Sequence, residues 1–446
     1  MRINRPFRVF ALAVLLLGLS LEKADAQQKL TLDQCIEIAL ENNLDIQKAR
    51  NNVIGAEARE QQSKYNFLPN LNAAIDYSTN YGVFFDNTTF SLEDITTSTS
   101  SPRLSAELNV FNGMKNHRLL KKRRLEKESA EENVQSNADN TRRSVLGLYL
   151  QVLTDRENIR IAEDRLNLLT GQMERAQKRA DAGVSNLEEF YNLKSQIASE
   201  NLNRVRQENA LKRDKLSLLQ LLQLDVNGDY EFEGVESVNG EIEAGVSSFS
   251  MIYEKAINYS PELKIAEYNH QAAKQDIKIA EADLLPSISL FGSASSRYSS
   301  NYTDGDDESV PYFNQLQDFF SQSIGATLRI PIFNRMSTKT NIQGAKVIRS
   351  NAFLDLQQSK IDLTNNLQRS YTDVIAAQET YQAAKENLVA LEESFKYSKA
   401  RYENGDVDFY TYMESLNNKN RAEIDLMISR YTFILQKKVL NIYAGE

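Results

Sequence analysis

The sequence contains an internal duplication, and this duplication constrains the fold more than any other feature. Residues 32–72 recur 217 positions later, and residues 111–187 recur 222 positions later. The clearest correspondences join Leu68-Pro69 to Leu285-Pro286 and Gly183 to Gly405. Internal duplication on this scale predicts an extended architecture with pseudo-twofold symmetry. We therefore divide the chain into residues 1–26, a first repeat over 27–248 and a second repeat over 249–446.

Residues 1–26 predict a secretory signal peptide. Arg2, Arg5 and Arg8 precede an apolar run from Val9 to Leu19, and Ala24-Asp25-Ala26 forms a small-residue cleavage site. The apolar run is shorter than the roughly 20 residues that a spanning helix needs, which favours export over a membrane anchor.

Charge and cysteine content restrict the partners. The chain has a net charge of −9 and no basic stripe, which argues against nucleic acid as a partner. Its single cysteine, Cys35, lies among apolar residues at helical spacing, so we expect a small buried side chain rather than a reactive thiol.

Two very long helical hairpins are predicted. No proline lies between Pro102 and Pro261, and none follows Pro331. Apolar and small residues keep the heptad spacing of a coiled coil at Val134, Ala138, Thr141, Val145, Leu148, Val152, Asp155, Ile159, Ala162, Leu166, Leu169, Met173, Ala176 and Ala180. The same register recurs from Leu367 to Tyr402. We predict hairpins over residues 115–224 and 337–443.

Each hairpin turns at a glycine and is accompanied by a shorter helix. Gly183 and Gly405 can supply left-handed C-caps, and Ser185 and Asp408 can cap the helices that follow. Helical patterns also predict single helices over residues 31–66 and 250–284. Residues 225–248, rich in Gly, Asn and Glu, are predicted to connect the repeats.

Four segments alternate with a period of two and predict strands. They are residues 70–81, 103–111, 287–298 and 324–333. Strands of about ten residues with one apolar and one polar face are typical of membrane barrels, although soluble hairpins remain the alternative. Four strands cannot close a useful barrel, and open edges are not tolerated in lipid. We therefore expect three copies, with twelve strands and a tube of helices.

Several weak motifs occur twice and in the same order. They are an Ala-x-x-x-Asn-x-x-Leu type of entry helix (residues 39–46 and 256–263), Leu-Pro before a strand, Phe-Asn after the next strand, and an Arg-x-x-x-Gly hairpin tip. With these motifs the mature chain resembles the TolC-like outer membrane efflux protein family.

The resemblance implies a mainly α-helical chain with membrane β-strands, assembled as a homotrimer. A twelve-stranded β-barrel would cross the outer membrane, and an α-helical barrel would lie in the periplasm. The function implied is a passive duct of a tripartite efflux or type I secretion system. Its partners would be a periplasmic adaptor protein and an inner-membrane pump of the RND or ABC type, and no cofactor is implied.

The resemblance also assigns candidate site residues. The adaptor would dock at the hairpin tips, at Gly183, Val184, Gly405 and Val407, although Asp406 departs from the apolar or small residue usual there. A periplasmic gate would be formed by Asp406, Asp408 and Glu414, while Thr411 stands where another carboxylate is expected. A ring of three Glu414 side chains would attract cations. The alternative is that these acidic side chains are only solvated surface charges of an exposed hairpin.

Other functional classes find less support. The two histidines, His117 and His270, have no partners at metal-ligand spacing, and no nucleotide-binding or nucleophile motif is present, so an enzyme is not expected. The acidic loop with Asp304, Asp306, Asp307 and Glu308 lacks the spacing of a calcium loop. A periplasmic coiled-coil adaptor or scaffold without a channel of its own remains the alternative function. The sequence does not indicate a cargo.

Overall fold

The computed structural model describes residues 28–86, 90–94, 96–183, 187–234, 246–303 and 308–446. The predicted signal peptide, Val184, Ser185 and the first three acids of the 304–308 loop lie outside these residues. The chain forms two compact units. The helical unit comprises Met1–Lys48, Val134–Ser260 and Ile361–Glu446, and the sheet unit comprises Ala49–Asn133 and Pro261–Lys360. Each unit contains parts of both repeats, so the repeats are not separate domains.

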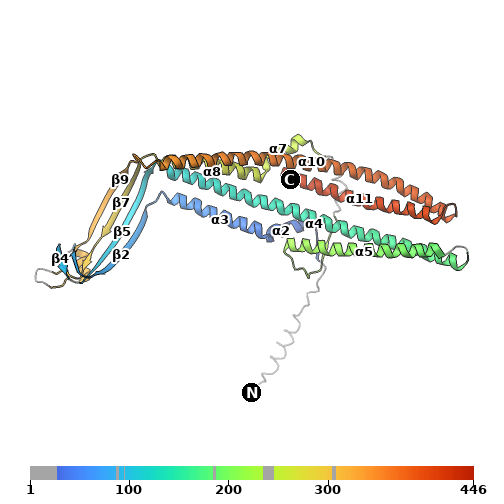
Figure 1. The fold of residues 1–446 in the computed structure, drawn as a ribbon, viewed down its shortest axis with the longest axis horizontal. Helices are drawn as coiled ribbons and strands as arrows, with labels where there is room; N and C mark the ends of the chain where they lie inside the picture. Colours follow the sequence, from blue (N-terminus) through green and yellow to red (C-terminus); the bar gives the residue numbers. More distant parts are fainter. Residues whose placement is uncertain (1–27, 87–89, 95, 184–186, 235–245, 304–307) are drawn as a thin grey trace, which may run out of the picture. The chain divides into compact units, whose positions relative to one another are not determined.

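The duplication is visible in the lengths of the helices (Figure 1). The first repeat contains α2 (Leu32–Asn42), α3 (Leu44–Tyr65), α4 (Lys115–Asp181) and α5 (Leu187–Leu222), with 11, 22, 67 and 36 residues. The second contains α7 (Phe249–Tyr259), α8 (Pro261–Ala282), α10 (Ser337–Glu403) and α11 (Phe409–Ala444), with the same four lengths. The helices therefore preserve the two sequence offsets at both ends.

The two shorter predicted helices, residues 31–66 and 250–284, are each broken once. In the first, Asn43 interrupts the helix, and its side-chain oxygen accepts from the backbone N–H groups of Asp45 and Ile46 at 2.8 and 3.1 Å. In the second, Ser260 ends α7 and Pro261 begins α8. Proline has no N–H to donate and is favoured at the first position of a helix, so a new helix starts there. The prediction of unbroken helices was wrong at these two positions.

The predicted heptad seam forms the interior of the helical unit. Every seam position from Val134 to Ala180 is buried or half-buried. Cys35 is completely buried in the same core, and burial raises the pKa of its thiol to about 12. The expectation of a small buried side chain is confirmed.

A short parallel pairing lies beside this core. Strand β1 (Gln28–Leu30) pairs with β6 (Tyr230–Phe232), which falls within the predicted connector. The buried phenol of Tyr149 donates to the carbonyl oxygens of Leu30 and Glu233 at 3.1 and 2.6 Å. Tyr149 thereby joins α4 to the last residue of β1 and to the residue that follows β6.

The sheet unit contains an antiparallel sheet in the order β2, β5, β7, β9 (Figure 1). The strands are β2 (Asn70–Asn80), β5 (Thr97–Asn112), β7 (Ser287–Ser295) and β9 (Ser321–Arg329). The second strand begins six residues before the predicted segment 103–111. The fourth ends at Arg329 rather than at residue 333, because Pro331 cannot donate to a strand ladder.

The loops between these strands contain further elements that were not predicted. Strands β3 (Val83–Asp86) and β4 (Ser91–Asp94) form a hairpin. The short strand β8 (Tyr298–Ser299), which ends the predicted segment 287–298 as a separate piece, pairs with β5. Helix α9 (Tyr312–Asp318) precedes the last strand.

The sheet has one apolar and one polar face. Its register places Leu71, Ala106, Gly292 and Ile324 in one row, and Asn72, Ser105, Ser293 and Ser323 in the neighbouring row on the opposite face. The described residues leave the apolar face uncovered, since Ile75 is 71% exposed and Ile324 is 92% exposed. Apolar side chains are thus presented outward along this sheet.

Among the described residues, none of the helices is long and apolar enough to cross a membrane.

Candidate functional site at the hairpin tips

Both hairpins of the helical unit end at a glycine with left-handed backbone geometry. Gly183 has φ +71° and Gly405 has φ +80°. After α10, the N–H of Gly405 donates to the carbonyl of Tyr402 at 3.1 Å, and the N–H of Asp406 donates to that of Arg401 at 2.8 Å. These two bonds form a Schellman cap. A Cβ at either glycine would meet no atom within 4 Å, so backbone geometry and not packing requires glycine.

The three candidate gate acids have different environments. The Asp408 carboxylate caps α11 by accepting from the backbone N–H of Thr411 at 2.9 Å, as the sequence predicted. Hydrogen bonds from Thr411 to the ionised carboxylate lower the pKa of Asp408. Asp406 and Glu414 are exposed, and neither side chain contacts a partner among the described residues. The structure does not bring the three carboxylates into a common cluster within one chain.

Tyrosines of the second hairpin contact the first hairpin beside the tips. The phenol of Tyr412 accepts from Gln172 on α4 at 2.9 Å. The phenol of Tyr410 donates to Glu188 on α5 at 2.9 Å, and Tyr402 donates to Glu189 on the same helix. We call Tyr402, Tyr410 and Tyr412 the tyrosine cluster.

The pKa values of all three phenols in the tyrosine cluster are raised, which favours their protonated form. Burial, followed by the hydrogen bond to Glu189, raises the pKa of Tyr402. The hydrogen bond to Glu188 and its charge raise the pKa of Tyr410, although this ring is exposed. Burial is the largest cause of the raised pKa of Tyr412. The three phenols therefore stay protonated across the neutral pH range.

Apolar packing supports these polar contacts. The rings of Tyr402 and Tyr412 stack with centroids 4.8 Å apart. Tyr412 is fully buried against Leu169 and Ala176 of α4 and Leu193 of α5. The second hairpin is thus attached to the first by both a packed centre and hydrogen bonds at its rim.

The sequence prediction missed the tyrosine cluster, although the duplication contained a signal for it. The second repeat has Tyr402 and Tyr410 where the first has Ala180 and Glu188. Tyr410 moreover contacts Glu188, which is its own counterpart in the first repeat. The pair Ala180 and Tyr402, in which only the second repeat has a hydrogen-bonding side chain, is the signal for a contact between the two hairpins.

In the part of the chain that the structure describes, no three His, Cys, Asp or Glu side chains are arranged to hold a metal ion. His270 is buried against Phe353 in the sheet unit, and His117 packs edge-on against Phe67. Both imidazoles thus have aromatic neighbours.

Comparison with known proteins links this architecture to a family. The family described as "Outer membrane efflux protein" matches residues 35–223 and 252–427. Outer membrane protein TolC of Vibrio cholerae is 18% identical over 287 residues, which span 64% of this chain and 63% of that protein. The probable outer membrane lipoprotein SilC of Salmonella typhimurium is 24% identical over 88% of this chain and 81% of its own length.

The fold has a close counterpart among solved structures. CusC, crystallised in a study of transmembrane channel formation, superposes with a TM-score of 0.78. The superposition covers 93% of this chain and 91% of that chain at 19% sequence identity. Fold is therefore conserved where most side chains differ.

Proposed function

Because the chain belongs to the outer membrane efflux protein family, which is located in the outer membrane, we propose that it is the passive duct of a tripartite export system. In this proposal it conducts small molecules or proteins from the periplasm to the exterior. The helical unit lies in the periplasm, and energy comes from an inner-membrane pump.

The observation that carries the proposal is the open, two-faced sheet. Strands β2 and β9 are its outer strands, and each pairs with only one other strand of the sheet. Unpaired strand edges are costly in lipid, so other copies must pair with them. Three copies would supply twelve strands and close a barrel, with the apolar face toward lipid and the polar face toward the lumen.

Helix α10 supports the same assembly. Val347, Leu354 and Ile361 lie seven residues apart, and each is more than half exposed. An exposed heptad stripe of this kind is typical of a coiled-coil seam that packs against a helix of another chain. A neighbouring copy in the homotrimer is the partner that we propose.

The exposed tips fit the docking of a periplasmic adaptor. Gly183 and Gly405 have open space around them, and Val407 is half-buried beside the second tip. A helical hairpin of the adaptor could approach both glycines without steric conflict. An RND or ABC pump would then complete the assembly, and its identity would determine the cargo.

We further propose that the second hairpin closes the periplasmic end. Opening would separate it from the first hairpin and break the contacts of the tyrosine cluster. The exposed carboxylate of Glu414 would line the narrowed pore, where three copies would attract cations.

The test is the conductance of the purified protein in planar lipid bilayers. Discrete, cation-preferring steps from a trimeric species are expected. A protein that forms no channels and extracts as a soluble or lipid-anchored species would instead favour a periplasmic adaptor or scaffold.

A further inference from the structure

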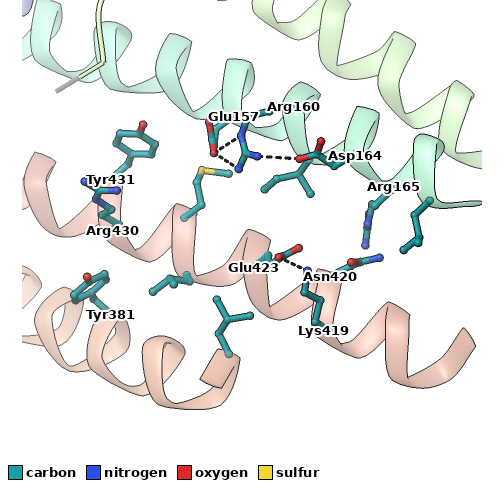
Figure 2. A pocket seen from close by; sticks show the side chains of 15 residues that line it. Glu157, Arg160, Asp164, Arg165, Tyr381, Lys419, Asn420, Glu423, Arg430 and Tyr431 are labelled. Carbon is teal, nitrogen blue, oxygen red and sulfur yellow. Dashed lines mark hydrogen bonds and ion pairs between the residues drawn. The ribbon is translucent and has the colours of Figure 1, made fainter. Parts of the chain in front are cut away.

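A cavity of about 520 Å³ lies inside the helical unit between α4, α10 and α11 (Figure 2). Helix α4 contributes Arg165 and Leu168 to its wall, α11 contributes Asn420 and Met427, and α10 contributes Leu388. The cavity thus touches both hairpins, and it is separate from the tyrosine cluster and from the candidate gate acids.

The carboxylates on the cavity wall already have cationic partners. Arg160 donates two hydrogen bonds to Glu157 at 2.8 and 2.5 Å and one to Asp164 at 2.9 Å. Lys419 pairs with Glu423 one turn along α11. Figure 2 shows these pairs along the walls, each within one helix. Each of the three acids therefore has a cationic partner on its own helix, and Arg160 is shared by Glu157 and Asp164.

Two polar groups on facing helices have unused hydrogen-bonding capacity. Arg165 is paired through Nη1 with Glu200 of α5 at 3.4 Å, but its buried Nε–H has no acceptor. The side chain of Asn420 is 5% exposed and makes no hydrogen bond with any described residue. In Figure 2, Arg165 extends from α4 toward Asn420 on α11. A buried donor without an acceptor is costly, so the Arg165 Nε–H favours an acceptor in the cavity, and the Asn420 amide on the facing helix could donate to the same group.

We propose that this cavity binds a small organic carboxylate. Its anionic group would accept hydrogen bonds from the Arg165 guanidinium and the Asn420 amide, and its apolar part would contact Leu168, Leu388 and Met427. Arginine matches the planar, two-oxygen geometry of a carboxylate. The cavity volume is typical of small-molecule sites, and apolar side chains share its wall with charged and polar ones.

Binding would connect the two hairpins. A ligand held by Arg165 of the first hairpin and Asn420 of the second binds best when the hairpins are together. If the second hairpin moves during opening, which rests on the proposed channel function, the ligand shifts the population toward the closed state. The site would then reduce conductance without blocking the pore.

The experiment is isothermal titration of the purified full-length protein in detergent with benzoate and with its neutral analogue benzamide. Benzoate should bind once per chain and at least about tenfold more tightly than benzamide, because only the anion matches Arg165. Arg165→Lys, which keeps the charge beside Glu200 but loses the planar fork, should weaken benzoate binding at least about tenfold. Asn420→Leu should act in the same direction.

Arg204→Gln is the matched control. Arg204 pairs with Glu208 along α5 and does not line the cavity, so its substitution should leave the affinity for benzoate unchanged. Absence of benzoate binding at millimolar concentration, equal binding of benzamide, or equal affinity of the Arg165→Lys variant would each overturn the proposal. Titration requires no channel activity, so a failed binding site and a failed channel assignment give different results.

Discussion

At the scale of single residues, the seam of the first hairpin contains an acid where a coiled coil usually has an apolar side chain. Asp155 is 3% exposed, and its Oδ2 atom is buried without a donor. It faces Asp214 of α5, while Gln151 donates to its other oxygen at 3.1 Å and Arg213 lies near enough to favour the ionised form. Burial and the facing Asp214 raise the pKa of Asp155 to about 6.

We expect Asp155→Asn to stabilise the protein at neutral pH. A carboxyl group with a raised pKa binds more protons when folded, so the stability of the native chain should fall as the pH rises from about 4 through 6. Above that range the variant should be more stable than the native protein by about 1–3 kcal/mol. Near pH 4 the stabilities of the variant and the native protein should become equal. Thermal unfolding followed by circular dichroism checks this. Asp164→Asn, at an exposed ion pair, should show no comparable gain at pH 8.

A second prediction at this scale concerns Glu414. If its exposed carboxylate lines the pore, Glu414→Gln should reduce cation selectivity and weaken block by multivalent cations in planar bilayers. Glu414→Asp keeps the charge and should preserve both properties. Unchanged selectivity in the glutamine variant would place this carboxylate outside the conducting path.

At the scale of elements, the sequence predicted both hairpins and the four strands because each has a strong periodic signal. The breaks at Asn43 and Ser260 were missed because one side-chain cap and one proline interrupt helices without disturbing their apolar pattern. The tyrosine cluster was missed because hydrogen bonds between distant helices have no local periodicity. Glycine, in contrast, predicted both tips, since few other residues adopt the left-handed backbone conformation of a helix C-cap.

The hydrogen bonds from Tyr402 and Tyr410 between the two hairpins should affect channel opening. Tyr402→Phe together with Tyr410→Phe removes the donors to Glu189 and Glu188 but retains the ring packing. Loss of the partly buried Tyr402 bond should destabilise the contact by about 1 kcal/mol, and the exposed Tyr410 bond should contribute less, so we expect the open probability to rise several-fold in single-channel recordings. Tyr397→Phe, an exposed ring on the same helix, is the control and should leave gating unchanged. Unchanged gating in the double variant would show that these contacts do not control channel opening.

Docking at the first tip can be tested separately. Gly183→Asp should abolish export while the trimer still forms, because aspartate tolerates positive φ better than most residues and adds a charge to the docking surface. Gly183→Asn has similar backbone tolerance without the charge, and it should retain more export than the aspartate variant. Full export by Gly183→Asp would show that the adaptor does not use this tip.

At the scale of the whole molecule, neither compact unit is a continuous piece of chain. Each of α3, α4 and α10 supplies residues to both units, and both repeats contribute to each unit. No single cut in the sequence would therefore release either unit intact. Assembly of the sheet and of the helices must proceed within one chain and, in the proposed trimer, among three.

The exposed stripe of α10 provides a test of that trimer. Leu354→Glu would place a charge in an apolar seam between copies, so we expect loss of the heat-resistant trimer on gel electrophoresis of outer-membrane fractions. Leu354→Met preserves apolar volume and should retain it. A stable trimer in the glutamate variant would mean that this stripe does not face another copy.

The matched helix lengths restrict how a chain of this kind can change in size. One heptad inserted into α4 and one into α5 would move the first tip by about 10 Å at 1.5 Å per residue. The second tip would stay in place, and Glu188 and Glu189 would be carried away from the tyrosines that they contact. Only equal insertions in α10 and α11 would restore the match. Variation in length should therefore occur in paired steps of seven residues, on both sides of both hairpins.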